Sequence, residues 1–301
     1  MDDQNEPGWG DSTDALGVRR GDASAAASWP SGSVAGGGLP TRKVSEMVVD
    51  CYKMDHRHRG KAIVINNKTF SPTLKLGVRT GTDIDATNLY SLFTKMGFDT
   101  TIEVDCAAQK IKNIMSKAAE DSHWDEDCFV CAILSHGEQG AVYATDAKMD
   151  LDELITPLKK CPSLAGKPKL FFIQACRGDK LDEGVEVCDA LGVAENDEEL
   201  DTRLVHRIPT EADFLMAFSC VPGYYAWRNS ERGTWFVQAL VDVLGKNWDR
   251  MDLLTMMTRV CKQVALDFES DVRRDPGFHR KKQVPCLSSM LTRDLYFTPK
   301  K

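Results

Sequence analysis

A cysteine and a histidine each follow an apolar segment of the sequence at a similar short distance. Residues 170–173 lead into Gln174 and Cys176, and residues 128–134 lead into His136. Short runs of branched and aromatic residues are typical of strands buried on both faces of a sheet. Open α/β sheets hold their active sites at the carboxyl edge of such strands. If the two strands are neighbours, an imidazole meets a thiol there, and an imidazole that takes the thiol proton makes a nucleophile.

The residue after the histidine fits the same chemistry. Gly137 lets a backbone N–H approach an oxyanion, and the amide of Cys176 is a candidate second donor. A single cysteine is more often a core side chain, and this chain holds ten cysteines. The hypothesis of a nucleophilic thiol therefore depends on the pair at matched strand ends.

Strands alternate with helices around this pair. The apolar periodicity predicts strands at residues 62–66, 98–104, 128–134, 170–173, 212–219 and 285–297, and helices at 82–96, 108–119, 151–159, 234–244 and 251–268. In the last helix the inward residues are expected to be Leu254, Met257, Cys261, Val264 and Phe268. The alternation favours a mostly parallel sheet with helices on both faces.

Two segments lack this periodicity. Residues 1–45 are rich in Gly, Ser, Ala and Asp, and we expect them to be disordered. Residues 179–202 carry ten acidic side chains against one lysine, which indicates a solvated loop or linker. The pentapeptide Asp-Ala-Leu-Gly-Val occurs in both, at 14–18 and at 189–193.

Composition limits the function classes. A hydrophobic fraction of 42% in 301 residues supports a sizeable core, and no apolar run approaches the length of a membrane span. The acidic N-terminus shows no secretory signal, so we expect a cytoplasmic protein with free thiols. The net charge of −7 argues against nucleic acid as the main partner.

Residues 174–178 read Gln-Ala-Cys-Arg-Gly, with Ser-His-Gly-Glu at 135–138, and this pattern resembles the caspase family of cysteine proteases. The likeness extends from about residue 50 to the end, and it is nearest to the executioner caspases. It includes Arg-Thr-Gly-Thr-Asp at 79–83, Ala-Asp-Phe-Leu at 212–215 and Lys-Gln-Val-Pro-Cys at 282–286. The fold it implies is the caspase-like three-layer sandwich, a mostly parallel central sheet with helices on both faces.

The resemblance implies cleavage after aspartate. Arg79 and Arg228 match the two arginines of the family's pocket, with Gln174 beside them. Two forked guanidiniums hold one carboxylate through charge-assisted bonds, which a neutral or basic side chain does not satisfy. Ala226 departs from the family, which usually has serine there, so we expect one polar contact to the aspartate to be missing.

Other matched positions concern the preceding substrate residues. Tyr225, Trp227 and Phe278 match the apolar cup for the second residue, and Asn229 and Trp235 match positions lining the fourth, where executioner caspases prefer another aspartate.

Two features qualify the match. The family's third catalytic element is a backbone carbonyl that orients the histidine, and it matches Gly77, where the side chain does not matter. Residues 271–277 differ from the family in length and composition, and this difference concerns the fourth-position preference.

An enzyme that cuts after aspartate also cuts itself where aspartate lies in an accessible segment. The candidate cleavage sites are Asp14, Asp189 and Asp201. Cuts at the first two would expose the same N-terminus, at Ala15 and at Ala190, of the kind that inhibitor-of-apoptosis proteins bind by its amine.

These sites divide the chain. The expected parts are a removable prodomain at 1–14 with disorder continuing to about 45, a large-subunit part at 46–189, a cleavable acidic linker at 190–201 and a small-subunit part at 202–301. By resemblance, two such units form a homodimer through the last strand, an upstream initiator caspase activates it, and its substrates are proteins with aspartate at the cleaved position. We expect no cofactor, no metal, no nucleic acid and no membrane partner.

Three alternatives remain at this stage. A catalytically silent homologue that only binds partners would have lost its Cys, its His or an arginine of the pair. A protease that cuts after basic residues would need acidic residues in place of the pocket arginines. The Cys-x-x-Cys at 128–131 could indicate zinc or redox chemistry, but residues three apart in a strand point to opposite faces, which favours core packing.

Overall fold

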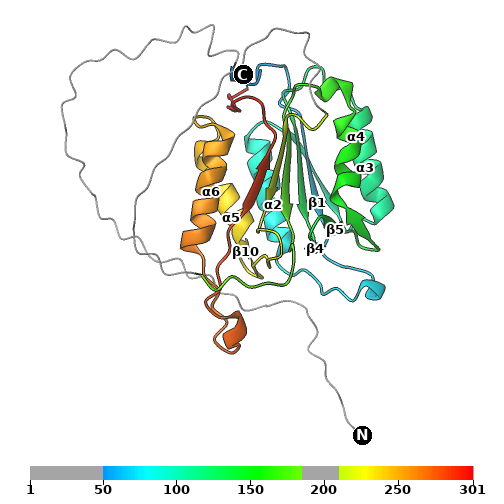
Figure 1. Ribbon diagram of the computed structural model, residues 1–301. Helices are drawn as coiled ribbons and strands as arrows, with labels where there is room; N and C mark the ends of the chain where they lie inside the picture. Colours follow the sequence, from blue (N-terminus) through cyan, green and yellow to red (C-terminus); the bar gives the residue numbers. More distant parts are fainter. Residues whose placement is uncertain (1–49, 185–209, 301) are drawn as a thin grey trace, which may run out of the picture.

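The computed structural model describes residues 50–184 and 210–300, and a six-stranded sheet runs through it (Figure 1). Every neighbouring pair in this sheet is parallel except the pair at one edge, which is antiparallel. The strands, in spatial order, are β11 (Cys286–Ser289), β8 (Phe214–Phe218), β7 (Lys169–Gln174), β3 (Phe129–Leu134), β1 (Lys61–Asn66) and β2 (Asp99–Val104).

The two middle strands are apolar for a structural reason. All six residues of β3 and all six of β7 are buried, because helices cover both faces of the sheet at this point. Cys128 and Cys131 lie in the cores on opposite faces, which confirms the predicted alternation of their side chains.

Helices form the outer two layers (Figure 1). The core on one face is shared by α2 (Thr82–Lys95), α5 (Trp235–Asn247) and α6 (Leu253–Asp267), and the core on the other by α3 (Ala108–Glu120) and α4 (Leu151–Lys159). This is the expected three-layer sandwich with a mostly parallel sheet.

Polar side chains fix where three of these helices begin. Asp150 caps α4, Thr234 caps α5 by accepting from the amide of Val237, and Asp252 caps α6. Such caps satisfy amides that have no partner within the helix.

Several short elements escaped the sequence-based prediction because two or three residues show no periodicity. They are the sheet of β4 (Gly137–Glu138), β5 (Ala141–Tyr143) and β6 (Lys148–Asp150), the pair β9 (Arg228–Asn229) and β10 (Gly233–Thr234), and the 3-10 turns η1 (Pro72–Leu74), η2 (Pro162–Leu164) and η3 (Pro276–Phe278).

Two expectations are corrected. The strand expected at 285–297 is only β11, because the chain then leaves the sheet and Leu295 accepts a 2.9 Å hydrogen bond from the amide of Leu253. On α6, Leu254 is 39% exposed and Cys261 is half-buried, whereas the predicted Met257, Val264 and Phe268 are buried. The buried face also includes Leu253, Met256 and Val260, which were not predicted. Adjacent leucines at the start of the helix made both phases plausible. The described part of the chain contains no helix whose length and apolarity would suffice to cross a bilayer.

Candidate active site

Cys176 and His136 leave the sheet side by side. Leu134 at the end of β3 pairs in register with Gln174 at the end of β7, and the amide of Ser135 donates to the carbonyl of Gln174 at 3.1 Å. His136 and Cys176 each lie two residues beyond this pair, so both emerge at the carboxyl edge at the same level. The expectation that strands three and four of the sequence are neighbours is therefore confirmed.

Gly137 lies against the backbone of the cysteine loop. A Cβ atom at Gly137 would lie 2.8 Å from the Cβ of Ala175 and 2.9 Å from the carbonyl oxygen of Cys176. Real Cβ atoms do not approach other atoms so closely, so only a residue without a Cβ fits at this position. The close approach brings this backbone beside the thiol-bearing loop, as an oxyanion donor requires.

The imidazole of His136 is fixed by a backbone carbonyl. Its Nε2 lies 2.8 Å from the carbonyl oxygen of Gly77. A carbonyl oxygen only accepts, so Nε2 carries the proton in this contact and Nδ1 keeps its lone pair. The ring of Phe70 packs on the imidazole, with centroids 4.9 Å apart.

Burial sets the protonation of the histidine. Burial, together with the charges of Arg79 and Arg228, lowers the pKa of His136 to about 4, although the hydrogen bond to Gly77 opposes the shift. The imidazole is therefore neutral at physiological pH and is able to accept a proton.

The thiol is also neutral in this structure. Burial raises the pKa of Cys176, while the amide of Ala226, 3.5 Å from Sγ, and the charges of Arg79 and Arg228 lower it. A thiol of this kind needs a base before it attacks a carbonyl carbon.

The positive charges of Arg79 and Arg228 affect the pKa of both His136 and Cys176. Arg79 is 1% exposed, and its Nη1 donates to the carbonyl of Asn67 at 3.0 Å and to Oγ1 of Thr82 at 2.8 Å. Arg228 lies half-buried on β9, and its charge contributes to the pKa of both His136 and Cys176.

Gln174 lies at the end of β7, two residues before the cysteine. Its side chain is buried, and its Oε1 accepts no hydrogen bond from the described residues. A buried amide oxygen without a donor is unusual in a folded protein and is expected where a ligand supplies the donor.

Asp85 is a carboxylate that could not be singled out from the sequence, and it joins helix α2 to the strand pair that carries Arg228. Asp85 on α2 is fully buried, and its Oδ1 accepts from the amide of Thr234 at 2.9 Å. Thr234 is the strand partner of Arg228, and the charges of Arg79 and Arg228 act on the carboxyl of Asp85. Burial nevertheless raises the pKa of Asp85 to about 6. A carboxylate near the start of a helix is common because it compensates the helix dipole, so only the fold shows what Asp85 contacts.

The expected apolar cup is a stack of rings. Trp227 and Trp235 are completely buried and stack with centroids 5.6 Å apart. Tyr225 and Phe278 contact Trp227 edge-on at 5.5 and 6.3 Å, and Trp235 stacks on Phe268 at 5.5 Å. The structure thus brings the predicted residues together, but it places the two tryptophans inside the molecule.

Asn229 has a local role in this structure. Its Oδ1 accepts from the amides of Glu231 and Arg232, both at 2.9 Å, in the turn between β9 and β10.

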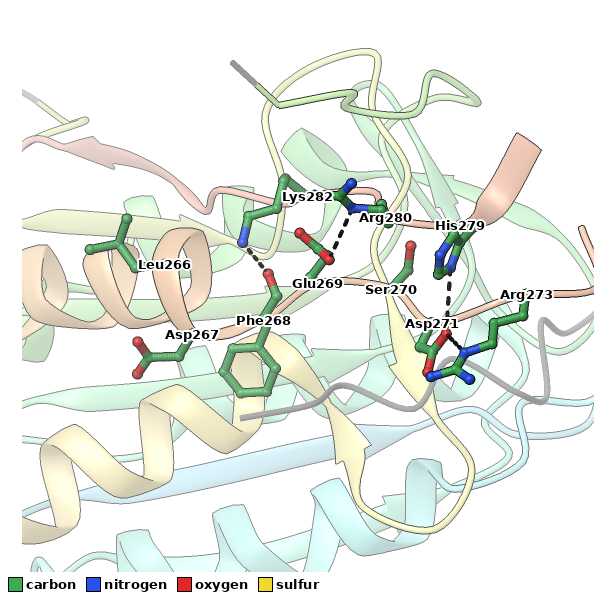
Figure 2. A pocket seen from close by; sticks show the side chains of 10 residues that line it. All are labelled: Leu266, Asp267, Phe268, Glu269, Ser270, Asp271, Arg273, His279, Arg280 and Lys282. Carbon is green, nitrogen blue, oxygen red and sulfur yellow. Dashed lines mark hydrogen bonds and ion pairs between the residues drawn. The ribbon is translucent and has the colours of Figure 1, made fainter. Parts of the chain in front are cut away.

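A charged cavity of about 600 Å³ adjoins the ring stack, between the end of α6 and η3 (Figure 2). Ion pairs cross it, from Arg280 to Glu269 at 3.5 Å and from Arg273 to Asp271 at 3.2 Å. Phe268 lines the cavity and belongs to the ring stack.

Several predictions lie outside the described residues. These are the cleavage sites Asp14, Asp189 and Asp201 and the new N-termini Ala15 and Ala190. Within residues 50–184 and 210–300, no group of three or more His, Cys, Asp or Glu side chains could hold a metal ion.

The family model described as "Caspase domain" matches residues 59–296. The chain is 46% identical over 248 residues to Caspase-7 of Gallus gallus, covering 82% of this chain and 79% of that protein. It is 47% identical over 277 residues to Caspase-1 of Drosophila melanogaster, covering 89% and 84% respectively. The crystal structure of Caspase-1 from Spodoptera frugiperda superposes with a TM-score of 0.77 at 44% identity, covering 84% of this chain and 94% of that one.

Proposed function

The chain belongs to the caspase family, and from this premise we propose how its residues act in an executioner enzyme. It is a cysteine endopeptidase that cleaves proteins after aspartate in apoptosis. The observation that carries the assignment of roles is the shared register of β3 and β7, which sends His136 and Cys176 out of the sheet together.

The proposed reaction begins with proton transfer from Cys176 Sγ to Nδ1 of His136, while the protonated Nε2 stays hydrogen-bonded to the carbonyl of Gly77. The thiolate attacks the scissile carbonyl carbon, and the amides of Gly137 and Cys176 stabilise the oxyanion. The imidazolium then protonates the departing amine, and a thioester remains. In the second half, His136 takes a proton from water as the resulting hydroxide attacks the thioester carbonyl. The carbon–sulfur bond then breaks, and the imidazolium returns its proton to the departing sulfur, which regenerates the thiol and the neutral imidazole.

Arg79, Arg228 and Gln174 hold the aspartate in this proposal. The support is that both guanidinium charges act on the reacting pair, and that the buried Gln174 ends β7 two residues before Cys176. Its amide nitrogen is the group that donates to the carboxylate, because the amide oxygen only accepts. Ala226 provides its amide to the sulfur but has no side-chain donor for the carboxylate.

The second and fourth substrate residues are assigned to the ring stack. Tyr225, Trp227 and Phe278 receive the second residue, and Asn229 and Trp235 line the site of the fourth. Because the tryptophans are buried in this structure, substrate binding must separate the rings. A change of tryptophan fluorescence on binding of a peptide inhibitor tests this step.

Activation is proposed to follow from cuts at Asp14, Asp189 and Asp201, by an upstream initiator caspase or by the enzyme itself. The products are a large subunit ending near residue 189 and a small subunit beginning after the linker, and two such pairs form a homodimer in the cytoplasm. Support for pairing through the small subunit is that β11 is the antiparallel edge strand of the sheet.

The new N-termini at Ala15 and Ala190 are proposed to bind inhibitor-of-apoptosis proteins through their amines. A pulldown with and without acetylation of these amines tests this. Binding that survives acetylation at both sites contradicts it.

The aspartate specificity is tested with four peptides that differ only in having Asp, Glu, Asn or Lys before the scissile bond. We expect kcat/KM for aspartate to exceed that for asparagine and lysine by at least about a hundredfold, because neither presents a carboxylate to the two arginines. For glutamate we expect a loss of about tenfold or more, because its extra methylene displaces the carboxylate. Equal hydrolysis of the lysyl peptide would contradict the proposal. Absence of hydrolysis by the processed chain would favour the silent homologue.

A further inference from the structure

The segment that follows the nucleophile, residues 177–184, is held on two sides. On one side, backbone hydrogen bonds join it to residues 223–225: the amide of Gly223 donates to the carbonyl of Arg177 at 2.9 Å, and the amide of Arg177 donates to the carbonyl of Tyr224 at 3.0 Å. Further along, the amide of Tyr225 donates to the carbonyl of Lys180 at 2.9 Å. These hydrogen bonds fix residues 177–184 to the loop that carries Tyr225.

The other side faces the loop between α6 and β11. The amide of Lys282 donates to the carbonyl of Asp182 at 2.9 Å, within an antiparallel bridge. Next to this bridge, Nζ of Lys281 lies 2.5 Å from Oε2 of Glu183. The side chain of Lys281 is 7% exposed, whereas that of Glu183 is 76% exposed.

Lys281 is itself tied to the loop that presents Phe278. Its amide donates to Oγ of Ser270 at 2.7 Å, and that hydroxyl donates to the carbonyl of Phe278 at 2.7 Å. Phe278 in turn contacts Trp227 in the ring stack. A continuous set of contacts therefore joins the residues after Cys176 to the rings assigned to the substrate.

We propose that Glu183 and Lys281 are positioning residues whose ion pair holds the post-cysteine segment against the loop that presents Phe278, and so shapes the site for the residues before the cut aspartate. The inference rests on the proposed function. A buried ammonium without its counter-ion is costly, so loss of Glu183 releases Lys281 from its position rather than leaving it in place. Glu183 lies six residues before Asp189, so the pair remains within the molecule after the linker is cut.

The experiment uses the full chain after processing, with Glu183→Gln, Lys281→Met and the double variant. We expect each single variant to raise KM for a tetrapeptide with aspartate at the first and fourth positions about three- to tenfold, with kcat changed less than twofold. The double variant should be no worse than either single one, because residues that act as a unit are not additive. The rate at which iodoacetamide alkylates Cys176 should stay within twofold.

The matched control is Asp121→Asn, which removes the partner of Lys61 from a pair that is also 2.5 Å long but lies at the amino edge of the sheet. Its KM should be unchanged. Glu183 is an exposed site, so Glu183→Gln remains informative even if Lys281→Met does not fold.

The outcomes separate the two claims. A Glu183→Gln enzyme with unchanged KM, or a double variant whose losses multiply, overturns the positioning role while aspartyl hydrolysis stands. An unmodified chain that fails to cut aspartyl peptides overturns the proposed function instead.

Discussion

Nε2 of His136 lies 2.8 Å from the carbonyl oxygen of Gly77, which leaves Nδ1 as the basic nitrogen. No carboxylate is needed for this orientation, because a carbonyl holds the proton on Nε2 equally well. The contact joins residues 59 positions apart, and it determines which nitrogen serves as the base.

The pH dependence of kcat/KM follows from the burial of His136. The folded pKa is lowered from 6.5 to about 4, so the imidazole stays neutral as pH falls through 6 and protonates only at lower pH. We expect the acid limb assigned to this group to lie below 6.5. Rates measured from pH 4 to 8, with recovery of activity at pH 7 as the control for unfolding, test this; a limb above 6.5 contradicts it.

Gly137→Ala should reduce kcat sharply. The added methyl group would lie 2.8 Å from the Cβ of Ala175 and 2.9 Å from the Cys176 carbonyl, so the backbone that carries the proposed oxyanion donor has to move. Loss of one such donor costs about 10²- to 10³-fold in kcat. The control is Gly245→Ala on α5, whose nearest neighbour is Leu92 at 3.9 Å. Equal kcat for both variants would refute the assignment.

Arg228→Lys should weaken recognition of aspartate. Lysine keeps the charge but loses the planar fork, so we expect kcat/KM for the aspartyl peptide to fall about tenfold or more. The control is Arg250→Lys, an exposed residue three positions beyond the end of α5, which should leave kcat/KM unchanged. A variant of Arg228 that retained full kcat/KM would argue against bidentate binding of the carboxylate.

Asp85→Asn should raise thermal stability at pH 7. The folded pKa of Asp85 is raised to about 6, so folding disfavours its ionised form, and this loss of stability sets in as pH rises from about 4 through 6. Asparagine keeps an acceptor for the Thr234 amide without the charge. Unfolding of the Cys176→Ala background, which removes the proposed nucleophile, should therefore show a higher Tm for Asp85→Asn at pH 7 and no gain at pH 4.

Asp83→Asn on the same helix is the contrasting control. The hydrogen bond from Lys68 lowers the pKa of Asp83 in the folded protein. The ionised carboxylate therefore stabilises the fold at pH values above its pKa in the unfolded chain, and this stabilisation is lost as pH falls through the folded-state pKa. We expect Tm at pH 7 to fall slightly, because the pair is partly exposed. Shifts of the same sign for both variants would contradict the account.

The local sequence pattern was sufficient to predict the sheet and the helical layers on its two faces. Buried strands such as β3 and β7 show as apolar runs, and alternation with helices implies parallel pairing, so the meeting of His136 with Cys176 could be predicted. The edge strand was overestimated, because Leu295 and Phe297 are buried against helices and are as apolar as strand residues.

The contacts between distant residues could not be predicted in the same way. Asp85 contacts Thr234 across 149 positions, and Glu183 contacts Lys281 across 98. Neither pair lies in a repeating sequence pattern that would predict it, because each contact depends on how distant parts of the chain come together in the fold. The complete burial of Trp227 and Trp235 likewise depends on Phe268 and Phe278 from another part of the chain.

The central claim is that Cys176 is the nucleophile of an aspartate-specific protease that processes itself. The most direct measurement is mass spectrometry of the purified chain beside its Cys176→Ala variant, expressed and incubated in the same way. We expect fragments ending at Asp189 or Asp201 from the unmodified chain and an intact 33.5 kDa product from the variant. A purified Cys176→Ala chain that still produced these fragments would contradict the claim.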